Sequence, residues 1–168
     1  MKEIIYNSDN LSIDDVNNVV KRAKALIVNS NDDILLGYGN NNYQIIGVHV
    51  EENETYEECL IREVKEETGI IIKEIDEKPF LNIKYYCKGY PSKNTNTLFD
   101  AYYYVIKTDQ KPDLKNANLT ENEKEGMFEF KFINKDNAIS ELVKTFNICK
   151  NKNTLKDTIN VIMEYLFK

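Results

Sequence analysis

The sequence predicts an α/β fold, in which strands dominate the middle of the chain and helices occupy its C-terminal end. Two patterns carry this prediction. Short runs rich in β-branched and aromatic residues, bounded by Asn, Asp and Gly, are typical of strands, and apolar residues at helical spacing are typical of helices. The chain has 168 residues, enough to bury a core, and no linker rich in Pro, Gly or Ser divides it. We therefore expect one domain over residues 1–168.

The N-terminal half is expected to form strands around one long helix. Residues 3–6 predict a short strand, and a helix is expected near Ile13 to Val20. The strand-like runs 24–30 and 33–39 are separated by an Asn/Asp turn, which favours a hairpin. Residues 43–50 then lead into the long helix.

The C-terminal half is expected to begin with strands and to end with two helices. Runs of β-branched and aromatic residues predict strands at 70–76, 78–87, 98–108 and 126–134. Helical spacing of apolar residues predicts a helix from Asp136 to about Phe146 and another near Thr154 to Phe167.

Both ends of the long helix are specified by local sequence. Thr55 and Glu58 have the spacing of a capping box, in which each side chain accepts a hydrogen bond from the other residue's backbone N–H. Gly69 stands where a left-handed residue ends a helix. A short helix with two defined ends should hold its side chains rigidly.

One face of this helix concentrates acidic residues. Glu63, Glu66 and Glu67 lie at i, i+3 and i+4, so their carboxylates repel one another, and the same arc holds apolar residues that should face inward. One interpretation is a solvated acidic face compensated by Arg62 and Lys65. The other is a site for Mg²⁺ or Mn²⁺, which prefer hard oxygen ligands and bridge to substrate phosphate.

The segment that contains these acids resembles a known family. Residues 47–70 read GVHVEENETYEECLIREVKEETGI, which is similar to the Nudix hydrolase box, G-x5-E-x7-R-E-U-x-E-E-x-G-U, with U an aliphatic residue. Eight of the nine defined positions match, and the ninth, the first glycine, is Val48 with Gly47 just before it. The matching residues are Glu54, Arg62, Glu63, Val64, Glu66, Glu67, Gly69 and Ile70.

The resemblance implies a fold and a reaction. The fold would be a Nudix-like α/β/α sandwich with a mixed β-sheet and a C-terminal helix. The reaction would be metal-dependent hydrolysis of a pyrophosphate bond in a nucleoside diphosphate linked to another moiety, with Mg²⁺ or Mn²⁺ as cofactor. An alternative is a catalytically weakened module that binds a nucleotide or metabolite as a sensor, which the departure at Val48 keeps open.

The resemblance also implies roles for individual residues. Glu66 and Glu67 would be direct metal ligands, joined by the backbone carbonyl of Gly47. Glu63 would be a further ligand or the base that deprotonates the attacking water. Arg62 would orient these acids, with Glu54 as its salt-bridge partner.

The general base has a second candidate location. Some family members take this base from a loop well beyond the box, and here Glu121, Glu123 and Glu125 precede the strand predicted at 126–134. Solvated loop acids are the other interpretation of this stretch. The sequence does not choose between Glu63 and the loop. His49, the one histidine, is expected to be structural or partly exposed, because the metal prefers oxygen.

The departure at Val48 leads to an expectation about activity. A glycine at this position allows positive φ or a close approach to the ligand, whereas a β-branched residue resists positive φ. We expect Val48 to keep a negative φ, and the cost to be either a tilted Gly47 carbonyl or a narrower pocket floor. On this view Val48→Gly raises kcat/KM by about tenfold or more.

Substrate contacts are less well determined by the sequence. Five tyrosines on predicted strands could stack on a nucleobase, although strand alternation favours packing roles for most of them. These are Tyr85, Tyr86, Tyr102, Tyr103 and Tyr104. Lys84, Lys88 and Lys93 form the densest basic group, which is either a solvated surface or a source of one or two phosphate contacts.

Composition excludes several classes of function. The net charge of −6 and the pI near 5.0 argue against a duplex nucleic acid as partner. The N-terminus lacks a basic region followed by an apolar stretch, and no apolar run approaches about 18 residues, so we expect a soluble cytoplasmic protein with no membrane partner. Three scattered cysteines favour reduced thiols over disulfides or a zinc site. A homodimer is compatible with the sequence.

Overall fold

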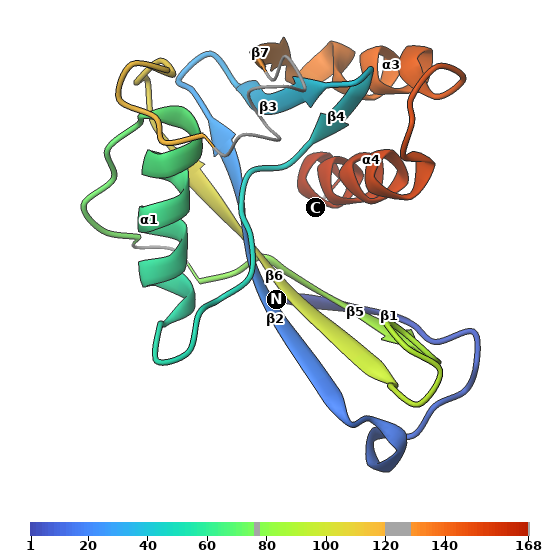
Figure 1. The fold of residues 1–168 in the computed structure, drawn as a ribbon. Helices are drawn as coiled ribbons and strands as arrows, with labels where there is room; N and C mark the ends of the chain where they lie inside the picture. The colour runs from blue at the N-terminus through green and yellow to red at the C-terminus, as the bar shows by residue number, and fades with distance from the viewer. Residues whose placement is uncertain (76–77, 120–128, 168) are drawn as a thin grey trace.

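The computed structural model describes residues 1–75, 78–119 and 129–167. It contains a seven-stranded mixed sheet with helices on both faces, which confirms the predicted α/β/α sandwich (Figure 1). Two long neighbouring strands, β2 (Asn18–Val28) and β6 (Thr97–Lys107), run through the middle of the molecule. Helix α1 (Tyr56–Thr68) lies on one side of them, and helices α3 (Lys135–Thr145) and α4 (Lys152–Leu166) lie on the other.

The sheet joins parallel and antiparallel pairs. Its main strand order is β1 (Lys2–Tyr6), β5 (Leu81–Cys87), β6 (Thr97–Lys107), β2 (Asn18–Val28), β3 (Asp33–Gly39) and β4 (Asn42–Gln44). The seventh strand, β7 (Glu129–Asn134), pairs antiparallel with β3. β2 pairs in parallel with β6 over its whole length, from Asn18 opposite Thr97 to Val28 opposite Lys107, and β1 pairs in parallel with β5. These long central strands provide a rigid platform.

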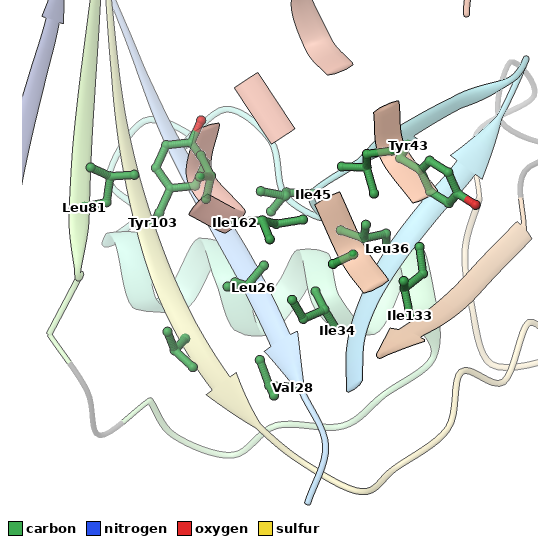
Figure 2. Packing of buried hydrophobic residues seen from close by; sticks show 14 of the residues in the cluster. Leu26, Val28, Ile34, Leu36, Tyr43, Ile45, Leu81, Tyr103, Ile133 and Ile162 are labelled. Carbon is green, nitrogen blue, oxygen red and sulfur yellow. The ribbon is translucent and has the colours of Figure 1, made fainter. Parts of the chain in front are cut away.

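The helices cover two separate apolar clusters. Helix α1 (Tyr56–Thr68) packs over the face of β2 that carries Ala23 and Ala25. On the opposite face Leu26 lies among buried side chains from β3 and from helix α4 (Lys152–Leu166), as Figure 2 shows. Helix α3 (Lys135–Thr145) packs on the same side as α4.

Strand alternation in β2 determines which side chains face α4. Because successive side chains point to opposite faces, Arg22 and Lys24 share the face of Leu26 rather than that of Ala23 and Ala25. Two cations therefore stand on the α4 side of the sheet, close to the end of its apolar core.

The helix predicted near Ile13 to Val20 is wrong. A single 3-10 turn, η1 (Ile13–Asp15), is closed by reciprocal hydrogen bonds between Ser12 and Asp15, and β2 begins at Asn18. The β-branched residues that follow the turn pair with β6, because a partner strand there satisfies their backbone groups.

The strand predicted at 70–76 is also wrong for residues 70–75, and 76–77 lie outside the described residues. The side-chain amide of Gln110 replaces a partner strand here. It accepts a hydrogen bond from the backbone N–H of Ile71 at 3.1 Å and donates one to the carbonyl of Ile71 at 2.9 Å. The apolar run is therefore an extended segment, with Ile70 buried under α1.

The remaining elements lie where the sequence predicts them, with shifted ends. The run 43–50 forms β4 and then two isolated antiparallel bridges to β2, Arg22 with His49 and Ala25 with Ile46. The predicted strand 126–134 is seen from residue 129, and 126–128 lie outside the described residues. Within the described ranges, no helix is both long and apolar enough to span a bilayer.

The end of α1 depends on a glycine, which gives the first testable prediction. Gly69 has φ 74°, and a Cβ there would lie 2.2 Å from the carbonyl oxygen of Asp113. Gly69→Ala should therefore lower the free energy of unfolding by more than about 2 kcal/mol, from positive φ and the clash together. Gly89 has φ 66°, and a Cβ there would make only ordinary van der Waals contact, 3.8 Å from the carbonyl oxygen of Lys93, so Gly89→Ala should cost only about 1 kcal/mol. Equal losses in urea denaturation would refute the close approach at Gly69.

Candidate active site

The caps predicted for α1 are both present. The Thr55 hydroxyl accepts a hydrogen bond from the Glu58 N–H at 3.1 Å, and the Glu58 carboxylate accepts one from the Thr55 N–H at 2.8 Å. Gly69 adopts the left-handed conformation at the C-terminal end, and its N–H bonds to the carbonyl of Lys65. Both ends of α1, and with them the extent of its acidic face, are thereby defined.

Arg62 joins the acids of α1 to the segment before the helix. Its Nε lies 2.8 Å from Oε1 of Glu54 and its Nη2 lies 2.9 Å from Oε2, so the salt bridge that the resemblance implied is present and is made at two points. Nη1 donates a hydrogen bond to Glu63 and lies 3.4 Å from Glu66. One guanidinium therefore holds three carboxylates, one of which, Glu63, is buried.

This pairing changes the acidity of its members. Hydrogen bonds from Arg62 lower the pKa of Glu54 to about 2, although partial burial acts in the opposite direction. Glu54, followed by Glu63, raises the pKa of Arg62. Both groups are charged at neutral pH, so the network is ionic.

Gly47 supplies a tight turn beside the helix. Its φ is 119°, and a Cβ there would lie 2.2 Å from the carbonyl oxygen of Ala23, so only glycine fits. The Gly47 N–H donates a hydrogen bond to Oε1 of Glu67 at 3.2 Å. The turn and the end of the acidic face are thus in direct contact.

Lys24 is a site residue that the sequence analysis missed. The two isolated bridges put it opposite Gly47, and its ammonium donates a hydrogen bond to the Gly47 carbonyl oxygen. Burial lowers the pKa of Lys24, and the negative charge of Glu67 opposes that shift. The alternation of Arg22 and Lys24 with Ala23 and Ala25 could have indicated that both cations share one face of a strand. That alternation becomes visible only when the strand begins at Asn18 rather than at residue 24.

Val48 packs against the apolar cluster under α1 instead of projecting into the site. Its φ is outside the positive range, as predicted, but its side chain packs against the α1 cluster with Val50 and Tyr56. Because the valine packs against the α1 cluster and Gly47 makes the turn, the structure argues against a narrowed pocket floor, and the alternative of a tilted Gly47 carbonyl stays a prediction. Val48 acts as a packing residue here.

The donor set suits a hard divalent cation. Glu63, Glu66, Glu67 and the Gly47 carbonyl offer oxygen atoms only, and they lie along one edge of α1. Among the described side chains, no group of three or more acids, cysteines or histidines already converges on one point. Mg²⁺ does not need such a cage, since it keeps several waters and takes one or two carboxylates together with substrate phosphate.

A cavity of about 200 Å³ lies on the α4 face of the sheet. Lys24, which contacts the Gly47 carbonyl, is also one of the residues that line it. Other lining residues come from β2, β5, β6 and α4, and include Arg22, Tyr85, Phe99, Tyr103 and Asp157. Lys24 is thus the side chain that connects this cavity to the Gly47 turn, while a separate hollow of about 520 Å³ is lined by Arg62 and Glu66 themselves.

The other candidates from the sequence fall outside this arrangement or outside the described residues. His49 is exposed, which agrees with a peripheral role, and Lys84 pairs with Glu3 on β1. Glu121, Glu123 and Glu125 lie in 120–128, which the structure does not describe, so the loop alternative for the general base is untested.

The predicted tyrosines divide between the two faces of the sheet. Tyr85 and Tyr103 line the cavity, whereas Tyr102 lies 4.7 Å, ring to ring, from Tyr56 of α1. Tyr104 is buried in the α1 cluster. All three cysteines are unpaired, as expected.

Comparisons with known proteins agree with this architecture. The NUDIX domain family model matches residues 17–147. A search of curated protein sequences gives no match. Among solved structures, the chain is similar to a MutT protein from Methanosarcina mazei Go1, with a TM-score of 0.55 and 15% identity over 90% of this chain and 97% of that one. It is also similar to a C. elegans Ap4A hydrolase, with a TM-score of 0.53 and 15% identity over 88% and 96%. At such identities the structural likeness establishes the fold.

The ionic network predicts a specific pH dependence. Because the folded-state pKa of Glu54, about 2, lies below its ordinary value of 4.5, its stabilising contribution is complete above 4.5 and is lost as the pH falls toward 2. Arg62→Met should remove this contribution, so that Tm falls less between about pH 5 and pH 3 than in the parent protein. Lys65→Met, which removes an exposed charge from the same helix, should keep the parental slope. Identical slopes in all three proteins would contradict the pairing.

The position of Val48 predicts a loss of stability rather than a gain in activity when it is replaced. Val48→Gly should lower the free energy of unfolding by about 2 kcal/mol, through lost apolar burial and added chain entropy, without raising kcat/KM. Val50→Gly is the matched control, because Val50 packs in the same cluster outside the turn. A tenfold rise in kcat/KM for Val48→Gly alone would restore the original expectation.

Proposed function

The chain belongs to the Nudix family, whose members hydrolyse pyrophosphate bonds, and from this premise we propose that it cleaves the diphosphate of a nucleoside diphosphate linked to another moiety, with Mg²⁺ or Mn²⁺ as cofactor. One observation carries the proposal: Arg62 gathers Glu54, Glu63 and Glu66 while Gly47 contacts Glu67. The acids of the box are thus held together along one edge of α1.

We assign the metal to Glu66, Glu67 and the Gly47 carbonyl, with Glu63 as a further ligand or as the base. A bound divalent ion supplies charge neutralisation for the diphosphate and lowers the pKa of a coordinated water. The carboxylates bring the hard oxygen donors that Mg²⁺ prefers.

The remaining side chains position these groups. Arg62 fixes the direction of Glu63 through a charge-assisted hydrogen bond, so that a carboxylate oxygen is available to accept a proton from the attacking water. Lys24 provides a positive charge at the boundary between the acids and the cavity, where a negatively charged diphosphate would pass. Glu123, which lies outside the described residues, is the alternative base in this proposal.

The sensor alternative loses its motivation. It depended on the missing glycine at position 48, and the neighbouring Gly47 provides the turn, with Val48 packed under α1. Hydrolysis is therefore the function that this arrangement supports best. A single domain, a cytoplasmic location and a homodimer accompany the proposal as further expectations.

A product analysis tests the proposed function. The purified protein is incubated with Mg²⁺ and a panel of nucleotide sugars, dinucleoside polyphosphates and nucleoside triphosphates, and the products are resolved by ion-exchange chromatography and mass spectrometry. The proposal predicts two products from at least one compound, each ending in phosphate. If the whole panel stays intact with Mg²⁺ and with Mn²⁺, the proposed function is wrong.

Glu67 gives a sharper prediction about the metal. Glu67→Gln should lower kcat by on the order of 100-fold or more, because the amide keeps the shape of the side chain but loses its anionic oxygen. Millimolar Mn²⁺ should raise Tm in the parent protein and much less in this variant. Glu52→Gln, an exposed change in the segment before α1, should behave like the parent. Normal turnover and a normal Mn²⁺ effect in Glu67→Gln would exclude Glu67 as a ligand.

A further inference from the structure

The cavity that Lys24 lines has walls of two chemical kinds, aromatic and charged. Aromatic rings of Tyr85, Phe99 and Tyr103 provide flat apolar surface, and the Arg22 guanidinium lies 4.7 Å from the centre of the Phe99 ring. Flat aromatic walls suit a planar heterocycle, which can stack on them regardless of its exact substituents. The aromatic walls therefore favour binding of a nucleobase but do not discriminate between the different bases.

Position links this cavity to the proposed reaction. Lys24 lines the cavity and donates a hydrogen bond to the carbonyl of Gly47, so the two sites share one side chain. A substrate whose diphosphate lies against the acids of α1 can therefore extend its nucleoside into the cavity. Small-molecule sites of this type combine apolar walls with a few fixed polar groups that provide selectivity.

Asp157 of α4 lines the cavity and provides carboxylate oxygen atoms that can accept hydrogen bonds from a ligand. The hydroxyl of Tyr85 donates a hydrogen bond to Oδ1 of Asp157, which holds the carboxylate in place. Oδ2 has no hydrogen bond to any described residue. Burial raises the pKa of Asp157, while the Tyr85 hydrogen bond and the charges of Arg22 and Lys24 favour its ionised form.

We propose that Asp157 makes this cavity selective for a guanine-type base, and this inference rests on the proposed function. An ionised carboxylate only accepts hydrogen bonds. Guanine presents two adjacent N–H donors, N1–H and the N2 amino group, next to a carbonyl. Adenine places an acceptor nitrogen beside its amino group, and uracil flanks its single N–H with two carbonyls. Arg22 and Lys24, on the same cavity, can donate to the guanine carbonyl.

Binding of product-like nucleotides tests this selectivity without catalysis. GMP, AMP, UMP and CMP are titrated by calorimetry into the full chain in the absence of metal. The Kd for GMP should be lower than that for AMP by at least about tenfold, and Asp157→Asn should weaken GMP binding by about tenfold and leave AMP within about twofold. Tyr85→Phe, which only releases the carboxylate, should produce a smaller loss for GMP. Thermal denaturation of each variant confirms folding.

A matched control and distinct outcomes keep the inference separate from the proposed function. Glu164→Gln makes the same chemical change on α4, at a residue outside the cavity, and should leave both affinities unchanged. Equal affinity for GMP and AMP, no binding of any nucleotide, or unchanged GMP binding in Asp157→Asn would overturn the inference even if hydrolysis is found. Conversely, GMP selectivity without turnover of any panel compound would support the cavity assignment and overturn the proposed reaction.

Discussion

The structure depends on how it accommodates several carboxylates within one turn of α1. Glu63 and Glu66 would repel each other on a bare helix, and Glu63 is also buried. Arg62, on the same helix, offsets this repulsion by pairing with both carboxylates. Glu54, in the segment before the helix, holds the Arg62 guanidinium in place. The same network therefore stabilises the fold and concentrates negative charge at one edge, where a divalent cation has the most to neutralise.

The second half of the site comes from the sheet. Gly47 brings its backbone against Glu67, and Lys24 of β2 lies across from it because the strands pair antiparallel at that point. Lys24 belongs to the sheet, whereas the acids belong to the helix that packs on it. The acids, the glycine turn and the cavity are thus connected in series, through the contact of Glu67 with Gly47 and that of Gly47 with Lys24.

The local parts of this arrangement could be predicted from the sequence, and the non-local parts could not. The capping box, Gly69 and the Glu54–Arg62 pair depend on residues less than a dozen positions apart, and all are present. Lys24 and Asp157 reach the site only through strand register and the packing of α4, which no spacing rule encodes. The strand expected at 70–76 is absent over the described residues 70–75 for a related reason, because a distant side chain, Gln110, takes the place of a partner strand there.

The central claim, that the acidic edge of α1 is a divalent metal site, is tested most directly by anomalous diffraction from a crystal soaked in Mn²⁺. The account predicts an anomalous peak at about 2.1 Å from carboxylate oxygens of Glu66 or Glu67 and beside the carbonyl of Gly47, with Lys24 moved away from that carbonyl. A crystal with Mn²⁺ bound elsewhere, or with no peak beside these residues at millimolar metal, would contradict it.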